Sequence, residues 1–178
     1  MAVEVKKITN VYEGKIFNMA VERIVLPNGM VKDREVVRHP GAAAMVPLFD
    51  DGKVALIKQY RHAVGEFLWE IPAGTLEPNE SPLACARREL VEETGFEARD
   101  LVKVADILPA PGYTDECIHI FLATGLTPAE QNLDDDEVLE VRPTPFDRAI
   151  EMIKEGKIQD AKTITGLLLI AMGKGTQG

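Results

Sequence analysis

Residues 74–96 read GTLEPNESPLACARRELVEETGF, and this stretch decides how the centre of the chain folds. Ser81 is a typical N-cap residue and Pro82 suits the first turn of a helix. Good helix formers follow, and Gly95 stands where a left-handed C-cap residue ends a helix. The sequence therefore predicts a helix from Ser81 to Thr94.

The predicted helix carries three acidic residues on one face. Glu89, Glu92 and Glu93 stand at positions i, i+3 and i+4, where like charges repel by roughly 0.2–0.5 kcal/mol per pair. A cation between them would remove this repulsion, and carboxylate oxygens on a rigid helix suit Mg²⁺ or Mn²⁺. A solvated acidic face is the alternative interpretation. The apolar residues Leu83, Ala86, Leu90 and Val91 would hold the other side of the helix against a sheet.

Strands are predicted on both sides of this helix. Short alternating runs from Val3 to Val37, broken by the turn Pro27-Asn28-Gly29, predict N-terminal hairpin strands. Apolar runs typical of buried strands lie at Ala42–Phe49, Val54–Tyr60, Leu68–Ile71, Val102–Leu108, Cys117–Thr124 and Val138–Val141.

Two further helices are predicted at the end of the chain. Thr144-Pro145 before Phe146 begins the first, and Asp160 before the apolar run Leu167–Met172 begins the second. No repeat or linker divides the 178 residues, so strands with a few packed helices indicate one α/β or α+β unit.

The composition limits the class of function. A formal net charge of −9 disfavours a nucleic-acid partner, because polyanion binding needs a basic surface. Cys85 and Cys117 have no ligand-type spacing and are expected to be buried thiols. The N-terminus lacks the apolar region of a secretion signal, and no apolar run approaches membrane-spanning length. We expect a cytoplasmic protein that does not interact with membranes.

Residues 74–96 also resemble the signature of the Nudix hydrolases, G-x5-E-x7-R-E-U-x-E-E-x-G-U, where U is apolar. The matching positions are Gly74, Glu80, Arg88, Glu89, Leu90, Glu92, Glu93, Gly95 and Phe96. The resemblance implies an α/β (α+β) fold, the Nudix αβα sandwich, with a mixed sheet, flanking helices and an N-terminal antiparallel β hairpin region. It implies one domain over residues 1–178, with an N-terminal β region (1–40) exchanged in a dimer, a catalytic core (41–142) and C-terminal helices (143–178).

Nudix hydrolases cleave nucleoside diphosphate compounds by attack of water at phosphorus, with the help of divalent cations. The resemblance implies two or more ions per site, Mg²⁺ with Mn²⁺ as an alternative. The implied metal ligands are Glu89 and Glu93, with Glu92 as an additional or water-mediated ligand and the carbonyl of Ala73. Arg88 and Glu80 would pair to fix the loop, and Gly74 and Gly95 would have structural roles in the motif.

Beyond the signature, the chain resembles the ADP-ribose pyrophosphatase (ADP-sugar pyrophosphatase) branch of the family over nearly its full length. Residues 110–116 are similar to its proline-containing loop, with Pro111 sixteen residues after Gly95. Ala110 stands where that branch normally has serine. Residues 59–61, 70–74 and 34–37 are similar to other segments of the branch. The implied reaction is hydrolysis of ADP-ribose to AMP and ribose 5-phosphate.

The same resemblance implies which residues bind the substrate. Arg61 would hold the diphosphate, and Thr75 would lie near the phosphates. The other implied substrate-binding residues are Pro111, Gly112 and Glu116 on the ribose side, and Ile16, Phe17, Arg34 and Glu35 around the adenine, contributed by the partner subunit of a homodimer. A surface role for Arg61 and a core role for Phe17 are the alternatives.

A general base is still required, since metal ions would occupy the helix carboxylates. In the ADP-ribose branch this base lies on an acidic loop, which here resembles residues 134–137. Glu137 is the first candidate and Asp135 the second, because the chain has Asp135-x-Glu137 where relatives carry Glu-x-Glu. A solvated charge run is the alternative.

Two other functions remain open at this point. The substrate could be another nucleotide sugar, such as GDP-mannose, or an oxidised nucleotide, although the Pro111 loop disfavours oxidised triphosphates. A Nudix-like ligand sensor without activity is a third hypothesis. Such a sensor would normally have lost signature carboxylates, and all of them are present in this sequence.

Overall fold

The computed structural model describes residues 2–133 and 137–175. The chain divides into two compact units: residues 1–41 with 108–117, and residues 42–107 with 118–178. We refer to them as the N-terminal unit and the larger unit.

The N-terminal unit is built on one antiparallel sheet. Its strands β1 (Glu4–Glu13), β2 (Asn18–Val25) and β3 (Val31–Arg38) are ordered β1-β2-β3. Gly29 has a φ of 84° in the turn between β2 and β3, where a side chain would be strained. Residues 108–117 are held to the end of β3, because the Val37 amide donates to the Tyr113 carbonyl over 2.8 Å. The predicted N-terminal hairpins are confirmed.

The larger unit contains two sheets. Its strands are β4 (Ala42–Pro47), β5 (Lys53–Arg61), β6 (Glu66–Glu70), β7 (Ala73–Thr75), β8 (Phe96–Ile107), β9 (Ile118–Pro128) and β10 (Leu139–Pro145). The first sheet has the order β7-β4-β9-β8 and is mixed, since only β4 and β9 run parallel. The second has the order β10-β5-β6 and is antiparallel.

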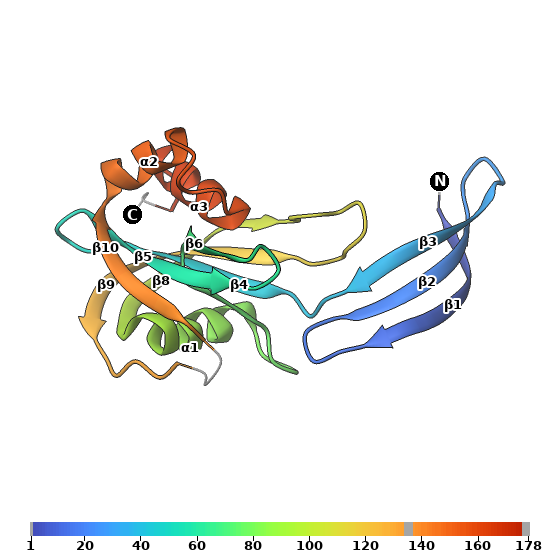
Figure 1. The fold of residues 1–178 in the computed structure, drawn as a ribbon, viewed down its shortest axis with the longest axis horizontal. Coiled ribbons are helices and arrows are strands. Elements are labelled where there is room, and N and C mark those ends of the chain that lie inside the picture. The colour runs from blue at the N-terminus through green and yellow to red at the C-terminus, as the bar shows by residue number, and fades with distance from the viewer. Residues whose placement is uncertain (1, 134–136, 176–178) are drawn as a thin grey trace. The chain divides into compact units, whose positions relative to one another are not determined.

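Helices cover both sides of these sheets. Helix α1 (Pro82–Thr94) lies on one side, and α2 (Phe146–Lys154) and α3 (Ala161–Ala171) lie on the other (Figure 1). Strand β4 is buried on both faces: Ala44 and Val46 pack with the α2 and α3 side, while Ala43 and Met45 pack with α1. This double burial explains why the strand reads as a continuous apolar run. The predicted αβα layering with a mixed sheet is confirmed.

Several details differ from the sequence-based expectation. Strands β8 and β9 extend beyond the predicted runs, and β7 was not predicted because it has three residues. Helix α2 has no side-chain cap, since its N-cap residue is Pro145, and the Thr144 hydroxyl donates to the Arg142 carbonyl over 2.9 Å. Strand β10 contains two prolines, which fits its position at a sheet edge.

Cys117 is partly rather than fully buried. Among the described residues, no helix is both long and apolar enough to cross a membrane.

Candidate active site

Helix α1 begins and ends at the predicted residues. The Ser81 hydroxyl accepts a hydrogen bond from the Ala84 amide over 3.2 Å, which satisfies one of the free amides of the first turn. Gly95 adopts a left-handed conformation with a φ of 70°, and its amide donates to the Val91 carbonyl over 2.8 Å. These two ends fix where the helix begins and ends, and therefore which residues lie on each of its faces. Its apolar face packs on the sheet, so the carboxylates of Glu89, Glu92 and Glu93 fall on another face.

Arg88 joins the helix to the loop before it. Its Nε and Nη2 donate to the two carboxylate oxygens of Glu80, each over 2.9 Å, and Nη2 also donates to the Thr75 carbonyl over 3.3 Å. Its Nη1 donates to Glu89 over 2.7 Å and to Glu92 over 3.0 Å. The guanidinium lowers the pKa of Glu80 to about 2, so this pair stays ionised throughout the physiological range.

Gly74 allows the closest approach between that loop and the helix. A Cβ atom at this position would lie 1.8 Å from the carboxylate carbon and one oxygen of Glu89, so any side chain here would displace that carboxylate. The neighbouring Ala73 amide donates to Glu93 Oε2 over 2.8 Å. The loop backbone therefore lies directly against the helix carboxylates, and Ala73 is placed beside them.

Glu93 is the most deeply buried of the helix acids, with only 1% of its surface exposed. Burial is the main cause that raises its pKa to about 8, and the negative charges of Glu89 and Glu137 raise it further. Burial also raises the pKa of Glu89, with smaller contributions from Glu92 and Glu137 in the same direction. Ionised carboxylates crowded in this way need positive charge, and their oxygens fit Mg²⁺ or a similar hard cation.

Glu137 lies close enough to Glu89 and Glu93 to act on both electrostatically, although it is more than 40 residues away in the sequence. The pairing of β10 with β5 brings it there, since the Tyr60 amide donates to the Val138 carbonyl over 3.0 Å. The other predicted candidate base, Asp135, lies outside the described residues.

Arg61 stands at the end of β5, on the face of the sheet that it shares with Gln59 and Glu70. Its Nε and Nη2 donate to the two oxygens of Glu70, each over 2.8 Å. Arg61 also interacts electrostatically with Glu93, so its charge lies near the helix carboxylates. The structure thus brings a planar cation, the kind of group that binds phosphate well, to the predicted metal site.

Two polar features of this region have no counterpart in the sequence-based prediction. Glu70 is buried with 1% exposure and also pairs with Lys162 of α3. The Gln59 side-chain oxygen is buried without a hydrogen-bond partner among the described residues, which is unusual for a folded protein. In the sequence, the only sign of this ion pair is Glu70 at the end of an apolar strand. Hydrophobic periodicity does not reveal that its partner, Lys162, lies on a distant helix.

Of the remaining predicted residues, only Thr75 belongs to the larger unit. It ends β7, opposite Ala42 in the register, with its side chain exposed beside the loop of the signature. The others belong to the N-terminal unit. They are Ile16 and Phe17 in the β1–β2 connection, Arg34 and Glu35 on β3, and Pro111, Gly112 and Glu116 in the segment held to β3.

Within the N-terminal unit, an ionic cluster that was not predicted fixes this last segment. Arg38, at the end of β3, pairs with Glu22 and with Asp115, the latter over 2.9 Å. The Asp115 carboxylate also accepts from the His39 amide over 2.9 Å. These contacts hold residues 111–116 beside β3, which carries Arg34 and Glu35.

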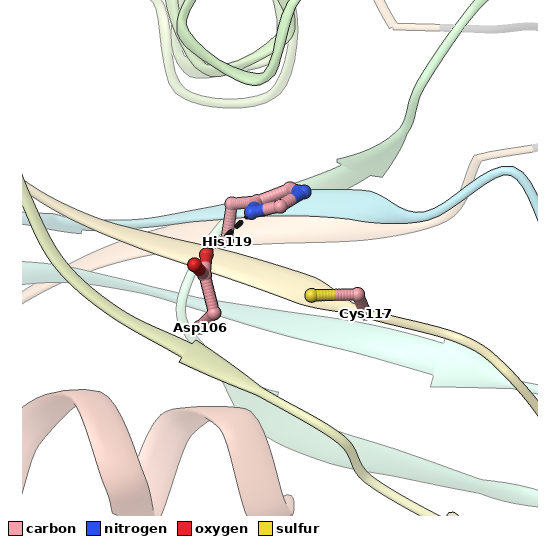
Figure 2. A group of neighbouring side chains, drawn as sticks. All are labelled: Asp106, Cys117 and His119. Atoms are coloured by element: carbon pink, nitrogen blue, oxygen red, sulfur yellow. Dashed lines mark hydrogen bonds and ion pairs between the residues drawn. The ribbon is translucent and has the colours of Figure 1, made fainter. Parts of the chain in front are cut away.

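A second group of polar side chains lies on and beside strands β8 and β9. Figure 2 shows Asp106 of β8 bonded to His119 of β9, with Cys117 drawn just before β9. Asp106 also pairs with Lys103 over 2.8 Å, so its charge is already compensated by a lysine. We assign no metal to this group.

Carboxylates that suit divalent cations, next to an arginine that suits phosphate, are typical of enzymes that act on phosphate compounds. The NUDIX domain matches residues 38–167, so the chain belongs to this family and is a Nudix pyrophosphohydrolase. It is 38% identical over 169 residues to the ADP-ribose pyrophosphatase of Bacillus subtilis (strain 168), covering 94% of this chain and 91% of that protein.

Two further comparisons agree with this assignment. A GDP-mannose pyrophosphatase of Escherichia coli O1:K1 is 36% identical over 159 residues, covering 79% of this chain and 82% of that protein. The crystal structure of an ADP compounds hydrolase superposes with a TM-score of 0.86 at 23% identity, covering 100% of this chain and 97% of that one. The latter similarity establishes the fold.

Proposed function

We propose that this protein hydrolyses the diphosphate bond of ADP-ribose to AMP and ribose 5-phosphate. The observation that carries the proposal is the convergence of Glu89, Glu93 and Glu137 next to Arg61. The 38% identity to an ADP-ribose pyrophosphatase over 94% of the chain supports this substrate.

In this proposal Glu89 and Glu93 are the principal metal ligands, Glu92 is an additional one, and the Ala73 carbonyl completes the set. Bound Mg²⁺ or Mn²⁺, two or more ions per site, would neutralise phosphate oxygens and lower the pKa of the attacking water. The Glu80–Arg88 pair keeps the loop in place, and Gly74 lets the loop backbone approach the Glu89 carboxylate.

The residues of the chain then have distinct tasks. Glu137 accepts the proton of the attacking water, whose oxygen bonds to one phosphorus while the bond from that phosphorus to the bridging oxygen breaks. The leaving phosphate takes up a proton, so the two products are phosphate monoesters. Asp135 is the second candidate for the base. Arg61 binds the diphosphate, and Thr75 lies near the phosphates.

The remaining substrate contacts are assigned to the N-terminal unit. We assign the ribose side to Pro111, Gly112 and Glu116, and the adenine to Ile16 and Phe17 with Arg34 and Glu35 nearby. Exposed fractions of 59% for Ile16 and 41% for Phe17 support a role in contacts outside their own sheet, since large apolar groups are seldom left in water together.

A homodimer is part of the proposal, with the N-terminal sheet as its interface. All ten residues of β1 are exposed, and Val5, Ile8 and Val11 are each about half exposed. Apolar side chains at this density on one strand favour burial against a second subunit. Light scattering coupled to size-exclusion chromatography tests this, and a fully active monomer would contradict it.

We also propose a cytoplasmic location, where Cys85 remains a reduced, buried thiol.

The substrate is tested with a panel of nucleoside diphosphate sugars in the presence of Mg²⁺, with products separated by ion-exchange chromatography. ADP-ribose should give AMP and ribose 5-phosphate with the highest kcat/KM, and Glu93→Gln serves as the inactive control. GDP-mannose is the second candidate, because a GDP-mannose pyrophosphatase is 36% identical to the chain. A higher kcat/KM for GDP-mannose would replace ADP-ribose in the proposal.

A further inference from the structure

A chain of charged groups connects the start of helix α3 to Arg61. Asp160 is the N-cap of α3, and its carboxylate accepts from the Thr163 amide over 2.9 Å. Its other oxygen accepts from Lys162 Nζ over 3.1 Å, and the same Nζ donates to Glu70 Oε2. Glu70 in turn holds Arg61 through two parallel bonds.

Glu70 and Lys162 are both removed from water, since their side chains are 1% and 10% exposed. A buried carboxylate is costly unless it is paired and its oxygens accept hydrogen bonds. Here Glu70 Oε1 accepts one bond from Arg61, while Oε2 accepts one from Arg61 and one from Lys162. The two carboxylates and two cations sum to zero charge, so the group is compensated as a whole.

Arg61 differs from its partners because it reaches the surface, with 38% of its side chain exposed. Glu70 occupies Nε and Nη2, and within residues 2–133 and 137–175 nothing accepts a hydrogen bond from Nη1. The Arg61 charge also interacts with Glu93 at the catalytic carboxylates. The guanidinium is therefore clamped on one edge, and its Nη1 donors remain for an anion.

Helix α3 has a fixed position relative to β6, which gives this arrangement its rigidity. The Ile71 amide donates to the Thr163 hydroxyl over 2.8 Å, and this hydroxyl is bonded to Asp160. Lys162 thus projects from a helix end that is bound to the residue following Glu70. Movement of Glu70 would break contacts to two elements at once.

We propose that Lys162 is a positioning residue for the substrate: it holds Glu70 in place, and Glu70 holds the Arg61 fork ready for the diphosphate. The inference rests on the proposed role of Arg61 in binding a nucleoside diphosphate. Lys162 also compensates part of the Glu70 charge, so that Arg61 keeps more of its attraction for phosphate. Loss of Lys162 weakens binding through both the orientation and the charge of Arg61.

The test compares Lys162→Met, Lys162→Arg and Lys157→Met in the full-length protein. Lys157 is an exposed control that pairs with Glu155. Lys162→Met should raise the KM for ADP-ribose about tenfold while kcat changes by less than about threefold, because misplacement of a binding group mainly weakens binding. Lys162→Arg should recover most of the affinity, and Lys157→Met should match the wild type. Calorimetric titration of ADP-ribose in EDTA should show the same order of affinities without metal.

A double-mutant cycle separates positioning from general damage to the fold. Arg61→Lys keeps a cation next to Glu70 but loses the planar guanidinium that Glu70 orients. Because nothing is then left to orient, adding Lys162→Met to Arg61→Lys should change KM by less than about twofold. An equal change in both backgrounds, or a wild-type KM in Lys162→Met, would overturn the inference. If thermal unfolding shows that Lys162→Met does not fold, Lys162→Gln takes its place in the same comparisons with the same criteria.

Failure of the proposed function gives a different result. In that case the wild type turns over none of the nucleoside diphosphate sugars. The binding titration in EDTA then tests by itself whether Lys162 positions Arg61. Binding of ADP-ribose that weakens in Lys162→Met but not in Lys157→Met would still support positioning. Absence of binding in the wild type would overturn the inference as well.

Discussion

Replacing Glu93 by glutamine should change how the stability of the metal-free protein depends on pH. Burial of Glu93, followed by the charge of Glu89, raises its pKa from 4.5 to about 8 in the folded state. Between these values the folded protein holds a proton that the unfolded chain has lost, so stability falls as pH rises. The difference of about 3.5 units (8 − 4.5), at about 1.4 kcal/mol per unit, gives a loss of up to about 5 kcal/mol above pH 8.

Glutamine at position 93 resembles the protonated acid and can still accept a hydrogen bond from the Ala73 amide. In EDTA, Glu93→Gln should therefore be more stable than the wild type at pH 9, by about 2–5 kcal/mol if water entering the site relieves part of the cost. The two proteins should converge near pH 4.5. Urea unfolding between pH 5 and pH 9 measures this, with the exposed Glu97→Gln as the control that keeps the wild-type slope.

Addition of Mg²⁺ should narrow this difference in stability. A ligand at about 100 times its dissociation constant stabilises the folded state by about 2.7 kcal/mol, and only the wild type retains the full ligand set. Parallel pH profiles of the wild type and Glu93→Gln in EDTA would refute the electrostatic reasoning. Equal stabilisation of both by Mg²⁺ would refute the assignment of Glu93 as a ligand.

Three further predictions concern activity. Glu89→Gln and Glu93→Gln should each lower turnover at least about a hundredfold with the fold intact, as steady-state kinetics and circular dichroism would show, and near-normal rates in both would contradict the metal assignment. If Glu137 is the base, Glu137→Gln should lower kcat by about two to four orders of magnitude with little change in KM. The kcat of Asp135→Asn should then stay within about tenfold of the wild type. The opposite pattern would assign the role of base to Asp135. Gly74→Ala should abolish activity because its Cβ would displace the Glu89 carboxylate, which lies 1.8 Å from that position, and an active variant would show that the loop can move.

Local signals in the sequence were sufficient to predict helix α1 and the residues it presents. A capping serine, a proline in the first turn and a glycine with left-handed backbone act within a few residues, so they operate in the same way wherever the helix lies. The spacing of Glu89, Glu92 and Glu93 places them on one face by helix geometry alone. The pairing of Arg88 with Glu80 likewise involves residues only eight positions apart.

Strand boundaries were predicted less well, because pairing rather than propensity decides where a strand ends. Strand β8 continues from Phe96 to Ile107 because β9 pairs with it over this whole length, although its exposed residues hide the apolar pattern. The three residues of β7 form a strand only because β4 lies beside them.

The sequence by itself determined the fold class, the helix with its carboxylate face, and the family resemblance, because these depend on short-range chemistry and periodicity. Only the tertiary structure decided that Glu137 comes close to Glu93, and that Lys162 and Glu70, 92 positions apart, share a buried contact. Such contacts form when distant strands and helices pack into one core, and the residues that make them carry no local sign of their partners. The contact of Arg61 with Glu70 likewise follows from the pairing of β5 with β6, which sets both side chains on the same face of the sheet.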